Sequence, residues 1–109
     1  MRIEYVRPLS PVLEDVSYEF AQVSIGGVEI DCEAEESDAS VSIPIMRTLE
    51  GQIVRGPLAP AAGAYVAEIL IPPRRYERVE ELNDENEIVT VSRPLPLECE
   101  RIVLRLWPL

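Results

Sequence analysis

The side chains of this chain that could do chemistry are mainly carboxylates and guanidinium groups. Its 109 residues include twenty acids, ten cations and no histidine, and all ten cations are arginines. Histidine is the usual proton shuttle and metal ligand near neutral pH, and lysine forms Schiff bases and grips phosphates. The composition therefore excludes a Ser-His-Asp triad and a Cys-His pair, and no glycine-rich phosphate loop is present.

Paired carboxylates are the one catalytic device that remains. Two carboxyl groups about 5 or 9 Å apart across a cleft can hydrolyse a glycosidic bond. Among sixteen glutamates some pair will meet such a spacing by chance, and the aromatic platforms of sugar sites are scarce, with one tryptophan and four tyrosines. An enzyme is therefore the least favoured class, and we assign no catalytic residue.

One short segment concentrates three of the arginines around a tyrosine: Arg74, Arg75, Tyr76 and Arg78. Guanidinium forks bind carboxylates and phosphates bidentately, so this cluster could hold an anion or dock on an acidic partner. The simpler interpretation is a solvated turn, since surface charge runs usually need no partner. The arginines would then pair with Glu77, Glu80 and Glu81.

Two acidic stretches could bind a metal ion or a basic surface. Residues 83–87 (NDENE) offer oxygen ligands of the kind calcium takes, but they lack the glycine turn and distant glutamate of an EF-hand loop. We expect a polar hairpin loop there, with no metal and no cofactor. The second stretch has acids at strand spacing, which discourage edge pairing: Glu29, Asp31, Glu33, Glu35 and Glu36. It could also receive an arginine face such as Arg101 and Arg105.

The C-terminal segment combines arginines with the only tryptophan. In a regular strand Trp107 projects to the same side as Arg105 and Arg101, opposite an apolar face that begins at Ile102. One interpretation places Trp107 at the end of the core. The other makes it an anchor for a partner chain, because tryptophan and arginine are enriched at binding hot spots.

Two cysteines, Cys32 and Cys99, lie far apart in the chain and form no CxxC motif. In a reducing compartment such residues are usually buried thiols that pack as small hydrophobes, and this is the favoured interpretation. A disulfide between paired strands is the alternative. A reactive thiolate is the least favoured, because no histidine or lysine is present to lower a thiol pKa.

The overall composition predicts one mostly β domain that covers residues 1–109. The hydrophobic fraction is 47%, the many valines and isoleucines favour strands, and ten prolines interrupt any long helix. A net charge of −10 argues against nucleic-acid binding and against an anionic membrane surface. No apolar run approaches the about 18 residues that span a bilayer, and residues 1–9 lack the apolar centre of a signal peptide.

The clearest local pattern is a hairpin at Gly26-Gly27 between residues 16–25 and 28–34. It pairs Ile25 with Val28, Val23 with Ile30 and Ala21 with Cys32. The apolar phase of the first run switches near residues 21–22, which predicts a β-bulge there. The alternative is a second apolar surface made by Val16, Tyr18 and Phe20.

Further strands are expected over 2–6, 41–45, 65–71, 88–92 and 97–107, with a short piece in 49–54. Pro44 suggests an edge, whereas the apolar run 65–71 suggests a central strand covered on both faces. Residues 74–82 could form a two-turn helix with Pro73 at its first position. The fold class is then a small antiparallel β-sandwich, or a partly open β-barrel, of seven or eight short strands with at most one short helix near residues 74–82.

The best functional hypothesis is a non-catalytic structural or assembly subunit that works through a protein partner or self-association. By analogy, a bacteriophage particle or another bacterial assembly would suit such a subunit. We expect it in the cytoplasm or within an assembled particle. The alternative is a ligand- or anion-binding β module built on the three clustered arginines Arg74, Arg75 and Arg78.

Overall fold

The computed structural model describes residues 1–109, which form ten β-strands, one four-residue α-helix and two short 3₁₀ turns. The first strands are β1 (Arg2–Tyr5), β2 (Val16–Glu19), β3 (Gln22–Ile25) and β4 (Val28–Asp31), followed by α1 (Cys32–Glu35). The middle of the chain contains β5 (Val41–Thr48), β6 (Ile53–Arg55), the turn η1 (Pro60–Ala62) and β7 (Gly63–Ile71). The last elements are β8 (Tyr76–Leu82), β9 (Ile88–Pro94), η2 (Cys99–Arg101) and β10 (Val103–Leu106).

The strands form three sheets. A five-stranded sheet has the order β1-β10-β7-β5-β6, a three-stranded sheet the order β2-β3-β4, and β8 pairs only with β9. All pairs are antiparallel except β1 with β10, which run parallel. The mostly β, antiparallel prediction is therefore confirmed. The strand count is ten rather than seven or eight, because the segment 16–25 forms two strands and the segment expected as a helix forms strand β8.

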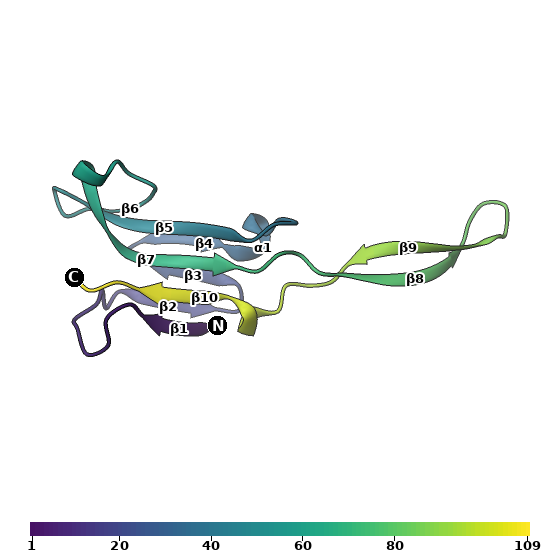
Figure 1. The fold of residues 1–109 in the computed structure, drawn as a ribbon, viewed down its shortest axis with the longest axis horizontal. Helices are drawn as coiled ribbons and strands as arrows, with labels where there is room; N and C mark the ends of the chain where they lie inside the picture. Colours follow the sequence, from purple (N-terminus) through teal and green to yellow (C-terminus); the bar gives the residue numbers. More distant parts are fainter.

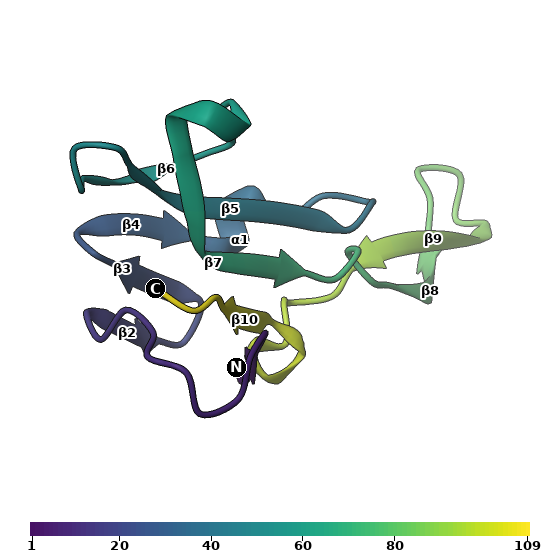
Figure 2. The same ribbon diagram turned by 60° about the vertical axis from the view of Figure 1, so that its left-hand side comes forward.

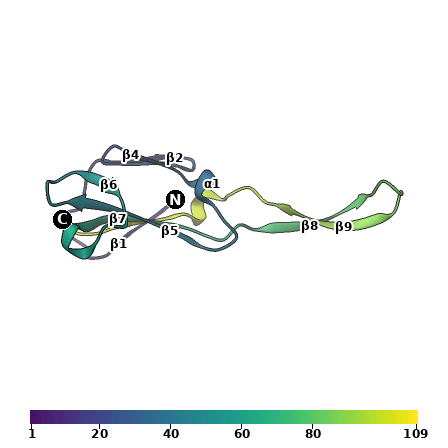
Figure 3. The same cartoon turned by 90° about the horizontal axis from the view of Figure 1, so that it is seen from above.

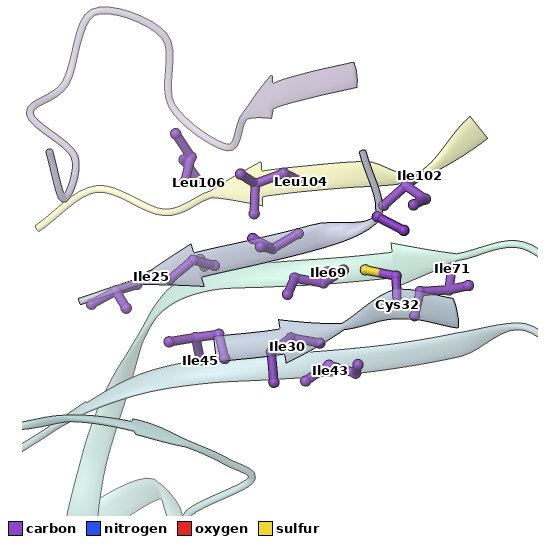
Figure 4. Close-up of a cluster of buried hydrophobic side chains, with 14 residues drawn as sticks. Ile25, Ile30, Cys32, Ile43, Ile45, Ile69, Ile71, Ile102, Leu104 and Leu106 are labelled. Atoms are coloured by element: carbon purple, nitrogen blue, oxygen red, sulfur yellow. The ribbon is translucent and has the colours of Figure 1, made fainter. Parts of the chain in front are cut away.

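The five-stranded and three-stranded sheets lie face to face (Figure 3). Of the two predicted alternatives, a sandwich or a partly open barrel, the arrangement is the sandwich. One cluster of 14 buried apolar residues fills the space between them (Figure 4). The three-stranded layer contributes Val23, Ile25 and Ile30 to this cluster, and the larger sheet contributes Ile69 and Leu104 among others. Branched aliphatic side chains suit this position because they pack well on pleated surfaces. The predicted alternation of β10 is confirmed, since Leu104 and Leu106 are buried.

The Gly26-Gly27 hairpin is confirmed in its predicted register. Val28 lies opposite Ile25 and Ile30 opposite Val23, and the Cys32 amide donates to the Ala21 carbonyl. Gly26 has a φ of +55° and Gly27 a φ of +86°, a region that glycine reaches without steric cost. Gly26 also approaches Ile53 of the other sheet so closely that a Cβ at position 26 would lie 2.7 Å from it.

The predicted bulge near residues 21–22 is wrong. The first run instead turns at Phe20-Ala21 and forms two strands, with Phe20 at a φ of 52°. The turn sets Val16 opposite Ile25 and Tyr18 opposite Val23, so even residues of β2 share a face with odd residues of β3. This explains the phase switch. Of the proposed second apolar surface, Val16 packs against the core and Phe20 is exposed.

The acidic strand expected to continue to Ala34 ends at Asp31. The Asp31 carboxylate accepts hydrogen bonds from the amides of Glu33 and Ala34 and thereby starts helix α1. Aspartate is a strong N-cap residue, because its side chain satisfies amides that have no partner within the helix. The alternation that resembled a strand is therefore interrupted by a local capping interaction.

Strand β7 is central, as predicted, and lies between β10 and β5, but it is not buried on both faces as expected. Its core-facing residues Ala67, Ile69 and Ile71 are buried, whereas Glu68 and Leu70 on the outer face are half-buried. Pro44 lies in β5, which is not an edge strand, but β6 covers only Ile45–Arg47. The Pro44 carbonyl accepts from the Gly56 amide beyond that ladder. The missing N–H of Pro44 therefore costs no hydrogen bond of the β5–β6 pair, which begins at Ile45.

The helix predicted over 74–82 is wrong, because this segment is strand β8. The spacing of three residues between Tyr76, Val79 and Leu82 fits a helix, and the segment has no strict alternation of apolar and charged residues that would indicate a strand. The decision comes from β9, which supplies a matching partner: Val79 lies opposite Val91, and Leu82 opposite Ile88. Arginines at the start and glutamates at the end also oppose a helix dipole.

The β8–β9 hairpin, which we call the arm, extends away from the sandwich (Figures 1 and 2). It gives the molecule an elongated outline of 63 × 27 × 20 Å. None of the arm residues 76–94 belongs to the buried cluster. No helix of the structure has the length and apolar character needed to cross a membrane.

We predict that Gly26→Ala destabilises the protein more than Gly27→Ala. Both substitutions place an L-residue at positive φ, which costs about 1–2 kcal/mol, and position 27 has open space for a Cβ. At position 26 the new methyl group must also displace Ile53, and such overpacking adds about 1–3 kcal/mol. Urea unfolding of both variants measures the difference. Equal losses would show that the two sheets do not approach closely at Gly26.

Candidate protein-interaction surfaces

The outer face of the five-stranded sheet carries a row of polar side chains that spans four strands. Arg105 on β10 donates to Glu68 on β7 at 3.1 Å and to Glu4 on β1 at 3.4 Å. Ser42 on β5 donates to the other oxygen of Glu68 at 2.7 Å, and Arg2 pairs with Glu4 at 3.0 Å. Such cross-strand contacts stabilise a sheet. Arg105 is therefore engaged within the chain instead of being presented to a partner.

Trp107 follows Arg105 and lies outside the buried cluster. Its ring stacks on Tyr65, with centroids 5.1 Å apart and planes inclined by 24°. The tryptophan is half-buried and its Nε1 has no hydrogen-bond partner in the chain. Of the two interpretations, the end of the core does not describe its position. The ring instead packs on Tyr65 of β7, and its role as an anchor for a partner chain stays a prediction.

Arg74 fastens the base of the arm to the segment after α1. Its guanidinium donates to the Glu36 carboxylate at 3.4 Å and to the Glu36 carbonyl at 3.1 Å, and its backbone amide donates to Ser37. The Tyr76 hydroxyl donates to Asp38 in the same segment. The Tyr76 hydroxyl, and then Glu36, raise the pKa of Arg74. Arg74 and Tyr76 therefore orient the arm on the sandwich.

The other predicted arginines do not join Arg74 in one site. Arg75 pairs with Glu98 at 3.0 Å on the other side of the arm base. Arg78, on the arm, and Arg101, in η2, are exposed and form no ion pair. The expected pairing of this cluster with Glu77, Glu80 and Glu81 is wrong for Arg74 and Arg75, whose partners come from distant segments.

The acids expected to receive Arg101 and Arg105 have other partners. Glu35 of α1 forms a bidentate pair with Arg55 of β6, at 2.6 and 2.9 Å, which joins elements of the two layers. The hydrogen bond from Arg55 lowers the pKa of Glu35, and the pKa of Arg55 is raised in turn. Glu36 binds Arg74. The acidic stretch therefore works mainly inside the chain.

The loop 83–87 closes the arm as a polar hairpin, as expected. The Asn83 side chain accepts hydrogen bonds from the amides of Glu85 and Glu87, both at 2.9 Å. Asn86 takes a φ of 60°, which asparagine tolerates better than most residues. Asn83 thereby orders the turn itself. No three His, Cys, Asp or Glu side chains of the structure are grouped so that they could hold a metal ion.

Both cysteines are free thiols. Cys32 is fully buried in the core and Cys99 is half-buried against it. Burial raises the pKa of Cys32 to about 11, with smaller contributions from Asp31, Cys99 and Glu35. The interpretation of Cys32 as a buried, small hydrophobe is confirmed.

The arm also carries an exposed apolar surface. Leu82 is 66% exposed and Ile88 70% exposed, although they lie opposite each other near its tip. On the opposite face Val79, Val89 and Val91 are half-buried, and Arg93 pairs with Glu81 above them. Sequence reasoning missed this surface because it treated 74–82 as a helix. The signal that could have found it lies in the partner segment 88–92, where Val89 and Val91 alternate with Thr90 and Ser92.

The comparisons with known proteins add no relative. No protein-family model, curated protein or solved structure matches this chain.

We predict a pH-dependent loss of stability in Glu35→Gln. Because the pKa of Glu35 in the folded state is lowered from 4.5, its pairing with Arg55 stabilises the fold above that pH. The contribution disappears as the pH falls through the lowered value. Since the pair is largely exposed, we expect a loss below about 1 kcal/mol at pH 7. Urea unfolding at pH 7 and pH 3 measures it, with Glu33→Gln as a control. An undiminished effect at pH 3 would contradict the assignment.

We predict that Cys32 resists alkylation in the folded protein. With a pKa of about 11, only about one Cys32 thiol in a thousand is ionised at pH 8, and the thiolate is the nucleophile. Iodoacetamide labelling of Cys99→Ser, which retains Cys32, should be slow in buffer and fast in urea. Fast labelling in buffer at the rate of a free peptide thiol would contradict the buried position.

Proposed function

We propose that this protein is a non-catalytic structural or assembly subunit that acts through protein contacts made by its arm. The observation that carries the proposal is a two-stranded ribbon, seven residues on each strand, that extends beyond the buried core with one face exposed. An isolated two-stranded hairpin is at best marginally stable in water. A ribbon of this kind is stabilised when another surface covers it.

Anchoring of the arm supports the same proposal. Two arginines and one tyrosine tie its base to separate parts of the sandwich, since Arg74 and Tyr76 contact 36–38 and Arg75 contacts Glu98. The Leu95 amide also donates to the Arg75 carbonyl below the hairpin. These contacts hold the arm in a defined direction. Preorganised elements bind with a smaller loss of conformational entropy than flexible loops.

The anion-binding alternative has less support from the geometry. Arg74 and Arg75 already face carboxylates of the chain, and Arg78 lies further along the arm. An incoming phosphate would have to displace Glu36 and Glu98 and approach a protein of net charge −10. The proposal therefore keeps the assembly role, in the cytoplasm or within a particle such as that of a bacteriophage.

We predict that the arm lies against protein in cells of the organism that encodes this chain. A photo-reactive phenylalanine analogue in place of Ile88 should produce crosslinked protein species, because Ile88 is exposed on the arm. The same analogue in place of Glu29, on the polar outer face of the three-stranded sheet, is the matched control. Denaturing electrophoresis and mass spectrometry identify the products.

The outcomes separate the two functions. Crosslinks from position 88 and none from position 29 support an assembly role, whether the product is a second copy or another protein. An absence of crosslinks from position 88, together with a melting temperature raised by sulfate or phosphate, would replace the proposal with the anion-binding module.

A further inference from the structure

One face of the arm is exposed along its whole length, although the Tyr76 hydroxyl at its base donates to Asp38. Strand alternation and the β8–β9 register place four cross-strand rows on this face. From base to tip the rows are Tyr76 with Pro94, Arg78 with Ser92, Glu80 with Thr90, and Leu82 with Ile88. All eight residues are exposed. We call this surface the arm face.

The rows of the arm face are arranged so that the surface complements itself. Its two ends are apolar, at Tyr76 and Leu82, and its centre has a cation at Arg78 next to an anion at Glu80. Neither Arg78 nor Glu80 takes part in an ion pair of the structure. Read from the opposite end, the sequence of rows becomes apolar, anion, cation, apolar. Two copies in opposite directions therefore match row by row.

We propose that the arm face is a self-association surface, on which the arms of two copies of this chain pack face to face and antiparallel about a two-fold axis. In this contact Arg78 of each copy meets Glu80 of the other, and the Tyr76 row meets the Leu82 row. A contact of this kind uses the same patch on both subunits, as most homodimers do. The inference rests on the proposed assembly function and names its partner.

Charge distribution in the arm favours the antiparallel direction. The tip carries Asp84, Glu85 and Glu87 without a cation, so parallel arms would bring two acidic tips together. Antiparallel arms place the tips at opposite ends of the contact. Like charges in direct contact are strongly unfavourable.

Face-to-face packing also avoids a like-charge contact that pairing through the free edge of β8 would create. If β8 paired antiparallel with β8 of a second copy, with the two Val79 residues opposite each other, Glu77 would lie opposite Glu81 of that copy. Like charges at directly opposite positions destabilise a sheet. Face-to-face packing keeps these two glutamates on the outside, where Arg93 already pairs with Glu81.

The size of the arm face predicts a weak dimer. It offers eight residues per copy, whereas a standard stable interface uses about 20–30 residues a side. We therefore expect concentration-dependent association, in which the mass measured by light scattering rises from 12.2 kDa toward twice that value.

Charge reversal tests the row pairing. Arg78→Glu and Glu80→Arg should each weaken dimerisation by about tenfold or more, because both symmetry-related pairs become repulsive. Mixing these two variants should restore association, since one chain then has two anions and the other two cations at the paired positions. The double variant Arg78→Glu/Glu80→Arg should dimerise by itself. Arg47→Glu, an exposed reversal on β5, is the matched control and should dimerise like the wild type.

A variant on β9 distinguishes the two packing modes. Ile88→Asp should abolish dimerisation in the face-to-face arrangement, whereas β8 edge pairing would leave it unchanged. Urea unfolding confirms that each variant remains folded.

Three results would overturn the inference: a wild type that stays monomeric at every concentration, a mixture that does not associate, or an Ile88→Asp variant that dimerises normally. The proposed function has a separate outcome. Crosslinks from position 88 to a different protein, together with a monomeric wild type, would reject self-association and retain the assembly role.

Discussion

The packing of the three-stranded sheet on the five-stranded sheet is the contact on which the rest of the structure depends. It buries the 14-residue cluster, which is the main source of stability for a chain of this size. The approach of Gly26 to Ile53 and the bidentate pair of Glu35 with Arg55 connect the two layers beside this core. The arm adds nothing to the cluster, and by extending beyond the sandwich it gives the whole molecule a length of 63 Å.

The ten arginines show how an acidic chain uses its few cations. Arg55 and Arg74 each contact acids far away in the sequence, and Arg105 joins β10 to two other strands. The planar guanidinium suits such contacts, because it can donate to two acceptors in a fixed geometry. The absence of lysine and histidine therefore bears on architecture as well as on catalysis. On the arm face, Arg78 is left with its charge unused by the chain itself.

Much of the sandwich could be predicted, because its patterns are local. The Gly26-Gly27 turn, the register of Val23 with Ile30 and the central position of β7 follow from turn chemistry and apolar alternation. The errors arose where a local pattern left two structures open or favoured the wrong one. The phase switch at residues 21–22 fits a bulge or a turn, and the three-residue spacing in 76–82 fits a helix although pairing with β9 makes this segment a strand. For the candidate site, the sequence marked Tyr76 and Arg78 within one segment, but it did not indicate the strand face that they share.

The sequence by itself determined the class of structure and the chemistry that is absent. Its β-branched residues, prolines and glycines favour short strands, and its lack of histidine and lysine removes most catalytic groups whatever the fold. Tertiary structure decided which residues act together. Only the pairing of β8 with β9 turns residues 76–94 into a ribbon and separates the exposed rows from the half-buried valines. This decision is non-local, because the face of each residue depends on a partner strand that local sequence patterns do not specify.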